Sequence, residues 1–137
     1  MELILDFGSF WKPATAVFIS WFVAQFLKAA INLRDKNPVS FLQDGGQISG
    51  HAATVSALAT VMLLETGLSL LFLMSLVIAA IVIKDAMGVR YETSKHSTFL
   101  NKLTKEDDFK IVGHSPIEVL TGITFGLIIP ILIYSVL

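Results

Sequence analysis

The sequence predicts an all-α integral membrane bundle of about four transmembrane helices. Of its 137 residues, 54% are hydrophobic and only 15% are charged, whereas soluble domains of this size carry about a quarter charged residues. The mean hydropathy is +0.73. Nine of the ten Lys and Arg residues fall within 28–36 and 84–110, so long stretches of the chain are free of cations. Together these observations exclude an ordinary soluble domain and a disordered segment.

Composition also excludes several classes of function. The chain has no cysteine, which excludes disulfide frameworks, thiolate metal sites and cysteine nucleophiles. A net charge of -1 provides no overall basic field, so we expect no nucleic acid partner. The length allows one membrane-embedded domain covering 1–137.

Four apolar stretches mark the expected helices, at approximately 13–33, 48–65, 68–90 and 115–137. The first and last have the roughly 20 residues that a membrane span needs, while the second is short. Glu65, Thr66 and Gly67 form the predicted tight turn between the second and third. Small residues along the second helix predict close packing: Ala52, Ala53, Ser56, Ala57, Ala59 and Thr60. We expect a polar loop over 91–113 that lies outside the membrane. Its charged residues need no functional explanation, because a solvated loop or a surface helix accounts for them.

Membrane topology follows from the number of spans. With four helices, the connections after the first and third lie on the same side, and both hold cations. The positive-inside rule places that face in the cytoplasm, with both termini on the other side. If these Lys and Arg residues instead bind an anionic substrate, their position is weaker evidence for the orientation of the protein in the membrane. We expect a multi-pass protein of the plasma (inner) membrane, and the thinness of a four-helix bundle favours a homodimer.

Unusual polar residues gather at the same face: Lys28 and Arg34 end the first helix, Ser49, Gly50 and His51 begin the second, Asp85 and Arg90 end the third, and His114 and Glu118 begin the fourth. Helix N-termini offer unpaired backbone N–H groups and the positive end of the helix dipole, which favour an anion. Arginine and lysine beside them would complete a pocket the size of a phosphate group.

Spacing suggests a chemical role for each ionisable residue. His114 and Glu118 are four residues apart and share a helix face, and Pro116 suits the first helical turn. Glu118 can then accept the N–H of one ring nitrogen and leave the other as a nucleophile. His51 can protonate the leaving oxygen as a general acid. Ionisable groups at membrane depth are costly, which favours a functional role.

Each of these residues alone also has a purely structural explanation. A histidine at a helix start is usually a cap or an interfacial residue. Lys28 can extend its ammonium group to the interface, and Arg90 can mark topology. Asp85 can form a structural ion pair with Lys84 or Arg90, and Glu118 can offset a helix dipole. The joint arrangement favours chemistry over five separate coincidences.

The residues resemble those of the phosphatidic acid phosphatase type 2 and vanadium haloperoxidase superfamily. Ser49-Gly50-His51 is similar to its second signature, Pro-Ser-Gly-His. The run from His114 to Val119, followed by Gly122, resembles the end of its third signature, His-x-x-x-Asp-Val-x-x-Gly. Lys28 and Arg34 resemble the lysine and arginine of its first signature. The run 84–90 is similar to a divergent branch of small membrane members, and the resemblance extends from about 28 to 122.

The resemblance implies hydrolysis of a phosphomonoester or pyrophosphate through a phosphohistidine, without metal or cofactor. By motif match, His114 is the nucleophile, Glu118 orients it and His51 is the acid. The phosphate-binding residues are Lys28, Arg34, Ser49, Gly50 and Arg90, with Asp85 in support. Ser49 and Gly50 would act partly through backbone N–H groups.

This sequence departs from the family pattern at several positions. Ile48 stands where the signature has proline, and Glu118 where it has aspartate. The gap from Lys28 to Arg34 is one residue shorter than usual. No arginine directly precedes His114. Arg90 can take that place only if 91–113 folds back and brings the third helix beside the fourth.

Three functions remain open from the sequence. The favoured one is a membrane phosphatase whose substrate is a lipid phosphate or pyrophosphate. The second is an inactive protein of the same fold that binds or transports a phosphorylated lipid. The third is a metallohydrolase with His51, His114 and Glu118 as metal ligands. His96 has no role in any of them.

Overall fold

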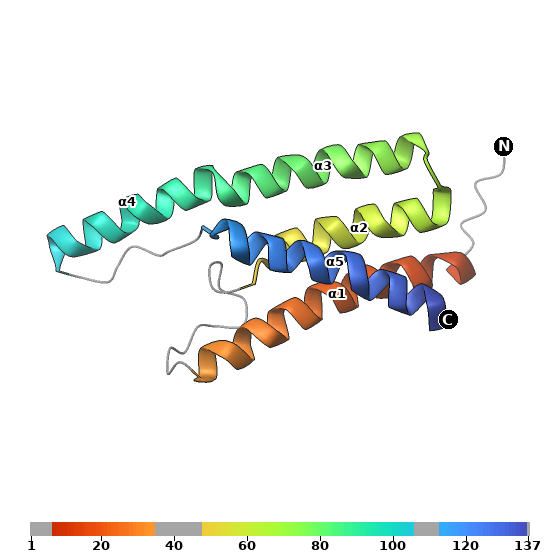
Figure 1. The fold of residues 1–137 in the computed structure, drawn as a ribbon, viewed down its shortest axis with the longest axis horizontal. Coiled ribbons are helices and arrows are strands. Elements are labelled where there is room, and N and C mark those ends of the chain that lie inside the picture. The colour runs from red at the N-terminus through yellow and green to blue at the C-terminus, as the bar shows by residue number, and fades with distance from the viewer. Residues whose placement is uncertain (1–6, 35–47, 106–112, 137) are drawn as a thin grey trace.

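The computed structural model describes residues 7–34, 48–105 and 113–136, without the side chains of 7–9 and 32–34. Within these ranges every regular element is a helix (Figure 1): α1 (Phe7–Arg34), α2 (Gly50–Thr66), α3 (Leu70–Met87), α4 (Val89–Thr104) and α5 (Pro116–Val136). This confirms the predicted all-α membrane bundle. Among the described residues, three stretches are long and apolar enough to cross a membrane, namely Phe10–Ile31, Leu70–Thr104 and Pro116–Val136.

Helix α2 is the centre of the bundle. It has 17 residues and packs against α1, α3 and α5. The small residues that predicted close packing are all buried: Ala52, Ala53, Ser56, Ala57, Ala59 and Thr60. Small side chains let backbones approach closely, which is how helices associate where the surrounding solvent is hydrocarbon.

Helices α2 and α5 lie close together, and two glycines permit this. A Cβ on Gly122 would lie 2.4 Å from the Ser49 carbonyl oxygen, and one on Gly126 would lie 2.5 Å from the Ala53 carbonyl oxygen. The Thr60 hydroxyl also donates to the Gly126 carbonyl at 3.3 Å. Any larger residue at these two positions would push the helices apart. Gly122 and Gly126 therefore determine how α5 is placed against α2.

A polar cluster ties the helices at the end where α1 begins and α5 finishes (Figure 1). The Tyr134 hydroxyl donates a hydrogen bond to Glu65. The Lys12 ammonium lies 4.5 Å from the centroid of the Tyr134 ring, within the range of a cation–π contact. This cluster joins α1, α2 and α5, and it lies far from the helix ends that carry the predicted site.

Helix α4 lies where we expected a polar loop over 91–113. Helices α3 and α4 meet at Gly88 and form one long rod, of which α4 is the part that extends beyond the other helices (Figure 1). Residues 106–112 of the expected loop lie outside the described residues.

The hydroxyl groups of α4 form hydrogen bonds inside the helix. Serine and threonine usually compete with helical hydrogen bonds, but here the hydroxyls of Thr93, Ser94 and Thr98 each donate to the carbonyl four residues earlier. Lys95 adds an ion pair with Glu92 at 2.7 Å. The hydroxyl groups of these serine and threonine residues are therefore satisfied within the helix and do not compete with its backbone hydrogen bonds.

Candidate functional site

Two backbone hydrogen bonds join the helices at the end of the bundle that carries the predicted site residues. This end is called the polar end below. The Ser49 N–H donates to the Glu118 carbonyl at 3.1 Å, and the His114 N–H donates to the Ala86 carbonyl at 3.4 Å. The start of α2, the end of α3 and the start of α5 therefore meet at one place. These are three of the four helix ends at which the sequence predicted the site.

His114 and Glu118 form a side-chain pair in this place. The His114 side chain is 3% exposed, and its Nδ1 lies 3.3 Å from Glu118 Oε2. An ionised carboxylate only accepts hydrogen bonds, so with Glu118 ionised the proton of the imidazole is on Nδ1. The unprotonated nitrogen of the ring is then Nε2. The two side chains are therefore in contact as expected, but His114 lies two residues before α5 and not on a helix face shared with Glu118.

Glu118 also caps the helix that carries it. Its Oε2 accepts the Ser115 N–H at 2.9 Å, and its own N–H donates to Ser115 Oγ at 3.4 Å. This reciprocal pair is a capping box, with Pro116 in the first turn. The structural and the chemical explanations of Glu118 therefore hold together, because the bonds that begin α5 also fix the carboxylate against His114.

The chain after the charged segment returns to the start of α4. A Cβ on Gly113 would lie 2.4 Å from the Arg90 carbonyl oxygen and 2.4 Å from Tyr91 Cα. The Gly113 N–H donates to Ser94 Oγ at 2.6 Å. The residue directly before His114 thus lies against the backbone of Arg90. This is the fold-back that the sequence required if Arg90 is to take the place of the absent arginine.

Asp85 holds the Arg90 side chain. Arg90 Nε donates to Asp85 Oδ2 at 2.6 Å, and the two side chains are 35% and 41% exposed. The ion pair weighed from the sequence therefore forms with Arg90. At this exposure the pair contributes little to stability, and its effect is to restrict where the guanidinium group lies.

The second signature begins α2. Ser49 is fully buried, and its Oγ accepts the Ala52 N–H at 3.3 Å as the helix cap. The backbone N–H of Ser49, which the resemblance assigns to phosphate, instead donates to Glu118. Gly50 is buried, whereas the His51 side chain is exposed. The structure therefore places His51 at the edge of the site rather than in its buried part.

Lys28 is 4% exposed although it lies in a membrane-spanning stretch. A lysine that merely reaches for the interface would keep its ammonium group in water, so burial excludes that explanation. A buried ammonium requires compensating polar groups or anions. Arg34 ends α1, and its side chain lies outside the described residues.

Gln25 is a polar residue that the sequence analysis missed. Its Nε2 would lie 3.2 Å from a Cβ on Gly50, and its Oε1 is buried without a hydrogen-bond partner among the described residues. Such orphaned buried acceptors are rare and require an explanation. The available signal was an amide three residues before Lys28 in an otherwise apolar stretch.

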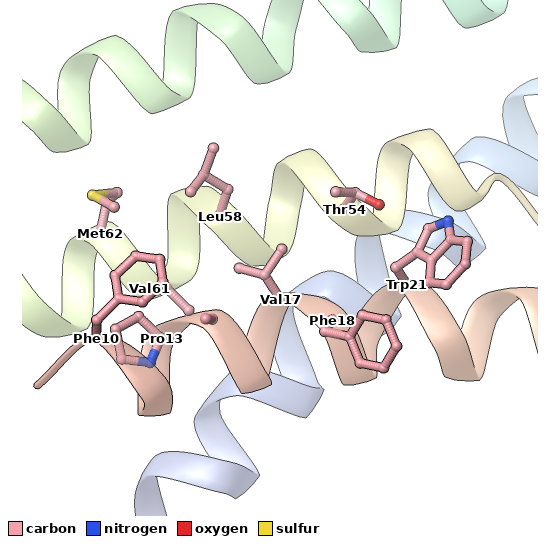
Figure 2. A pocket seen from close by; sticks show the side chains of 10 residues that line it. Phe10, Pro13, Val17, Phe18, Trp21, Thr54, Leu58, Val61 and Met62 are labelled. Carbon is pink, nitrogen blue, oxygen red and sulfur yellow. The ribbon is translucent and has the colours of Figure 1, made fainter. Parts of the chain in front are cut away.

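Two cavities of different character border α1. One, of about 400 Å³, lies between α1 and α2 and has apolar walls that include Val17, Trp21 and Leu58 (Figure 2). The other, of about 550 Å³, is lined by residues of α1, of α5 and by Ile48, and Ser115 and Glu118 are among them. Only the second of these two cavities therefore reaches the candidate site.

The described residues contain no group of three His, Asp or Glu side chains that could hold a metal ion. His114 and Glu118 contact each other, but the exposed His51 does not complete a ligand set with them. The geometry therefore gives the metallohydrolase alternative no site among these residues.

Comparison with known proteins agrees with the resemblance seen in the sequence. The model of a family described as the divergent PAP2 family matches residues 12–129. A curated relative, the uncharacterized membrane protein YuiD of Bacillus subtilis (strain 168), is 30% identical over an alignment that covers 97% of each chain. No solved structure matches the chain.

Proposed function

The chain belongs to the divergent PAP2 family, and from this membership and the geometry of the site we propose that it is a membrane phosphatase. Its substrate would be a lipid phosphate or pyrophosphate, hydrolysed through a phosphohistidine without a metal. The observation that carries the proposal is the buried His114 with its Nδ1 3.3 Å from the Glu118 carboxylate. That contact leaves Nε2 as the candidate nucleophile.

In the first step, His114 Nε2 attacks phosphorus, and the bond from phosphorus to the leaving oxygen breaks. The leaving alkoxide takes a proton from His51, whose exposed position at the start of α2 leaves room for the leaving group. Glu118 stabilises the positive charge that develops on the imidazole, as an orienting carboxylate does in a catalytic triad.

In the second step, water attacks the phosphohistidine, with His51 as the base that accepts its proton. The P–N bond breaks, which releases phosphate and regenerates His114. Lys28, Arg34 and Arg90 would neutralise the phosphoryl oxygens, on which charge is spread in the transition state. Gly50 would contribute its backbone N–H. Because the Ser49 N–H already donates to Glu118, Ser49 would act through its hydroxyl or through the position of the loop.

The test of this proposal is phosphate release by the purified protein from a panel of lipid phosphates. We include phosphatidate, phosphatidylglycerol phosphate and polyprenyl phosphates and pyrophosphates. Release from at least one substrate should be inhibited by vanadate and unaffected by a chelator. Release that the chelator abolishes, or release insensitive to vanadate, would contradict the phosphohistidine route.

A second candidate is a non-catalytic protein that binds or transports a phosphorylated lipid. The observation that favours it is the exposed position of His51 together with the engaged N–H of Ser49. This candidate predicts that vanadate or a lipid phosphate binds the protein while no phosphate is released from any member of the panel over hours.

We propose that the protein lies in the plasma (inner) membrane and that the polar end of the bundle faces the cytoplasm. Lys28, Lys84, Arg90 and Lys95 all lie toward that end, and the positive-inside rule then gives the orientation. Because the chain has no cysteine, single cysteines can report on this directly.

Lys95→Cys on α4 should react with a membrane-impermeant maleimide only after the membrane is opened. Leu68→Cys, which is 89% exposed in the turn between α2 and α3, should react in intact cells. The opposite pattern would overturn the orientation.

We also propose that the protein is a homodimer. Met74→Cys, on the exposed side of α3, tests this by disulfide crosslinking between the two copies. Crosslinking no stronger than random collision would contradict the dimer.

A further inference from the structure

The cavity between α1 and α5 has one polar end and apolar walls. Its volume is about 550 Å³, within the usual range of small-molecule sites. Ser115 and Glu118 line it, and Glu118 is the residue that contacts His114. The cavity therefore borders Glu118 of the proposed catalytic pair and continues away from it along the two helices.

The direction of the cavity follows from the spacing along α5. Glu118, Thr121 and Phe125 line it at intervals of three and four residues, so they lie on one face of the helix. Seven residues of helix correspond to about 10 Å along the axis. Because α5 begins at the polar end and is long enough to cross the membrane, this face leads from the site toward the membrane interior. Leu27 and Ile31 of α1 form the opposite wall.

We propose that this α1–α5 groove holds the hydrocarbon chain of a lipid phosphate whose phosphate group lies at His114. The inference rests on the proposed function and adds to it the place of the chain and the requirement for a long one. An apolar groove within a bilayer is filled by hydrocarbon, and only a molecule with an anionic head would also satisfy the polar end. Ile117 also lines the cavity and is 76% exposed, which leaves the groove open for a lipid to enter from the side.

The chain gains little affinity in this groove, because lipid tails already surround it in the membrane. The effect of the groove is to position the head group. We therefore expect the groove to act on the choice of substrate, so that long-chain phosphates are hydrolysed more efficiently than short, water-soluble ones.

The cavity between α1 and α2 provides a matched comparison. It is also apolar and borders the same helix, but its lining contains no ionisable residue (Figure 2). A hydrocarbon that merely seeks apolar surface would occupy both cavities, whereas a lipid phosphate anchored at His114 would occupy the α1–α5 groove.

The first experiment is photolabelling, which does not depend on turnover. The full-length protein in lipid nanodiscs is irradiated with a hexadecyl phosphate that carries a diazirine in its chain, and labelled peptides are mapped by mass spectrometry. We expect labels on Leu27, Ile31, Thr121 or Phe125, and their loss with excess hexadecyl phosphate but not with hexadecanol. Labels on Val17 or Leu58 instead, labels spread evenly, or no specific label would overturn the proposal.

The second experiment fills each cavity with a bulky side chain. Thr121→Trp should lower kcat/KM for hexadecyl phosphate relative to phenyl phosphate by tenfold or more, whereas Leu58→Trp should leave this ratio unchanged. Equal effects of the two variants would overturn the proposal. If the wild-type protein releases no phosphate from any substrate, the proposed phosphatase activity fails, and photolabelling still decides where the chain lies.

Discussion

His114→Ala should lower the rate of phosphate release by at least about a thousandfold, because it removes the attacking atom. Because Nδ1 of the ring contacts Glu118, the attacking atom in the proposed mechanism is Nε2. The measurement is the initial rate of phosphate release on the best lipid substrate. His51→Ala should cost less, about a hundredfold or more, since a general acid accelerates a step that still proceeds slowly without it.

His96→Ala is the matched control for this prediction. His96 is exposed on α4 and has no role in the proposed mechanism, so its loss should leave the rate within about twofold of the wild-type value. Both variants should retain the wild-type elution volume and thermal midpoint. A folded His114→Ala protein with full activity would contradict the phosphohistidine mechanism.

Gly113→Ala should have the second largest effect, on activity and on stability together. The new methyl group would lie 2.4 Å from the Arg90 carbonyl oxygen and from Tyr91 Cα. Both are backbone atoms of a helix, so the chain around Gly113 must move, at a cost of about 1–3 kcal/mol in the free energy of unfolding. Since His114 is the next residue, a displacement of about 1 Å should lower the rate by about a hundredfold.

Gly50→Ala controls for the general cost of an added methyl group near the site. Its Cβ would meet the Gln25 side chain at 3.2 Å, and a flexible side chain can move aside. The thermal midpoint of Gly113→Ala should therefore fall clearly below that of Gly50→Ala. Equal thermal midpoints for the two variants would contradict the close contact between Gly113 and the backbone of α4.

The fold was predictable because its determinants are local. Apolar stretches and the small residues of α2 each act over a few positions. The turn lies slightly later than predicted at Glu65–Gly67, because α2 continues to Thr66. Helix α4 was not predictable in the same way, because a run with Ser94, Lys95 and Thr98 is polar and rich in residues that favour loops. Its hydroxyl groups bond within the helix, and Ser94 also accepts the Gly113 N–H, which composition does not reveal.

The His114–Glu118 contact was predictable from its short spacing, although His114 lies two residues before α5 and the capping bonds between Ser115 and Glu118 hold the carboxylate in place. The contact of Gly113 with the Arg90 backbone could not be predicted. The sequence showed only that such a contact is required if Arg90 is to replace the absent arginine, because the position of Gly113 depends on the path of the charged segment. The exposed position of His51 follows from helix phase. The buried face of α2 runs through Ala52, Ala53 and Ser56, and its neighbour His51 is turned away from that face. The positions of the small residues along α2 would have predicted the exposure of His51, which the signature motif alone does not.

Direct detection of a phosphate group on His114 tests the central claim most closely. The protein is mixed with its best lipid substrate for a few milliseconds and quenched in alkali, because the P–N bond of phosphohistidine is labile in acid. Peptides are then mapped by mass spectrometry. The mechanism predicts phosphate on His114 in the wild-type protein and none in His114→Ala. Rapid phosphate release with no phosphorylated histidine, or with the label on His51, would contradict it.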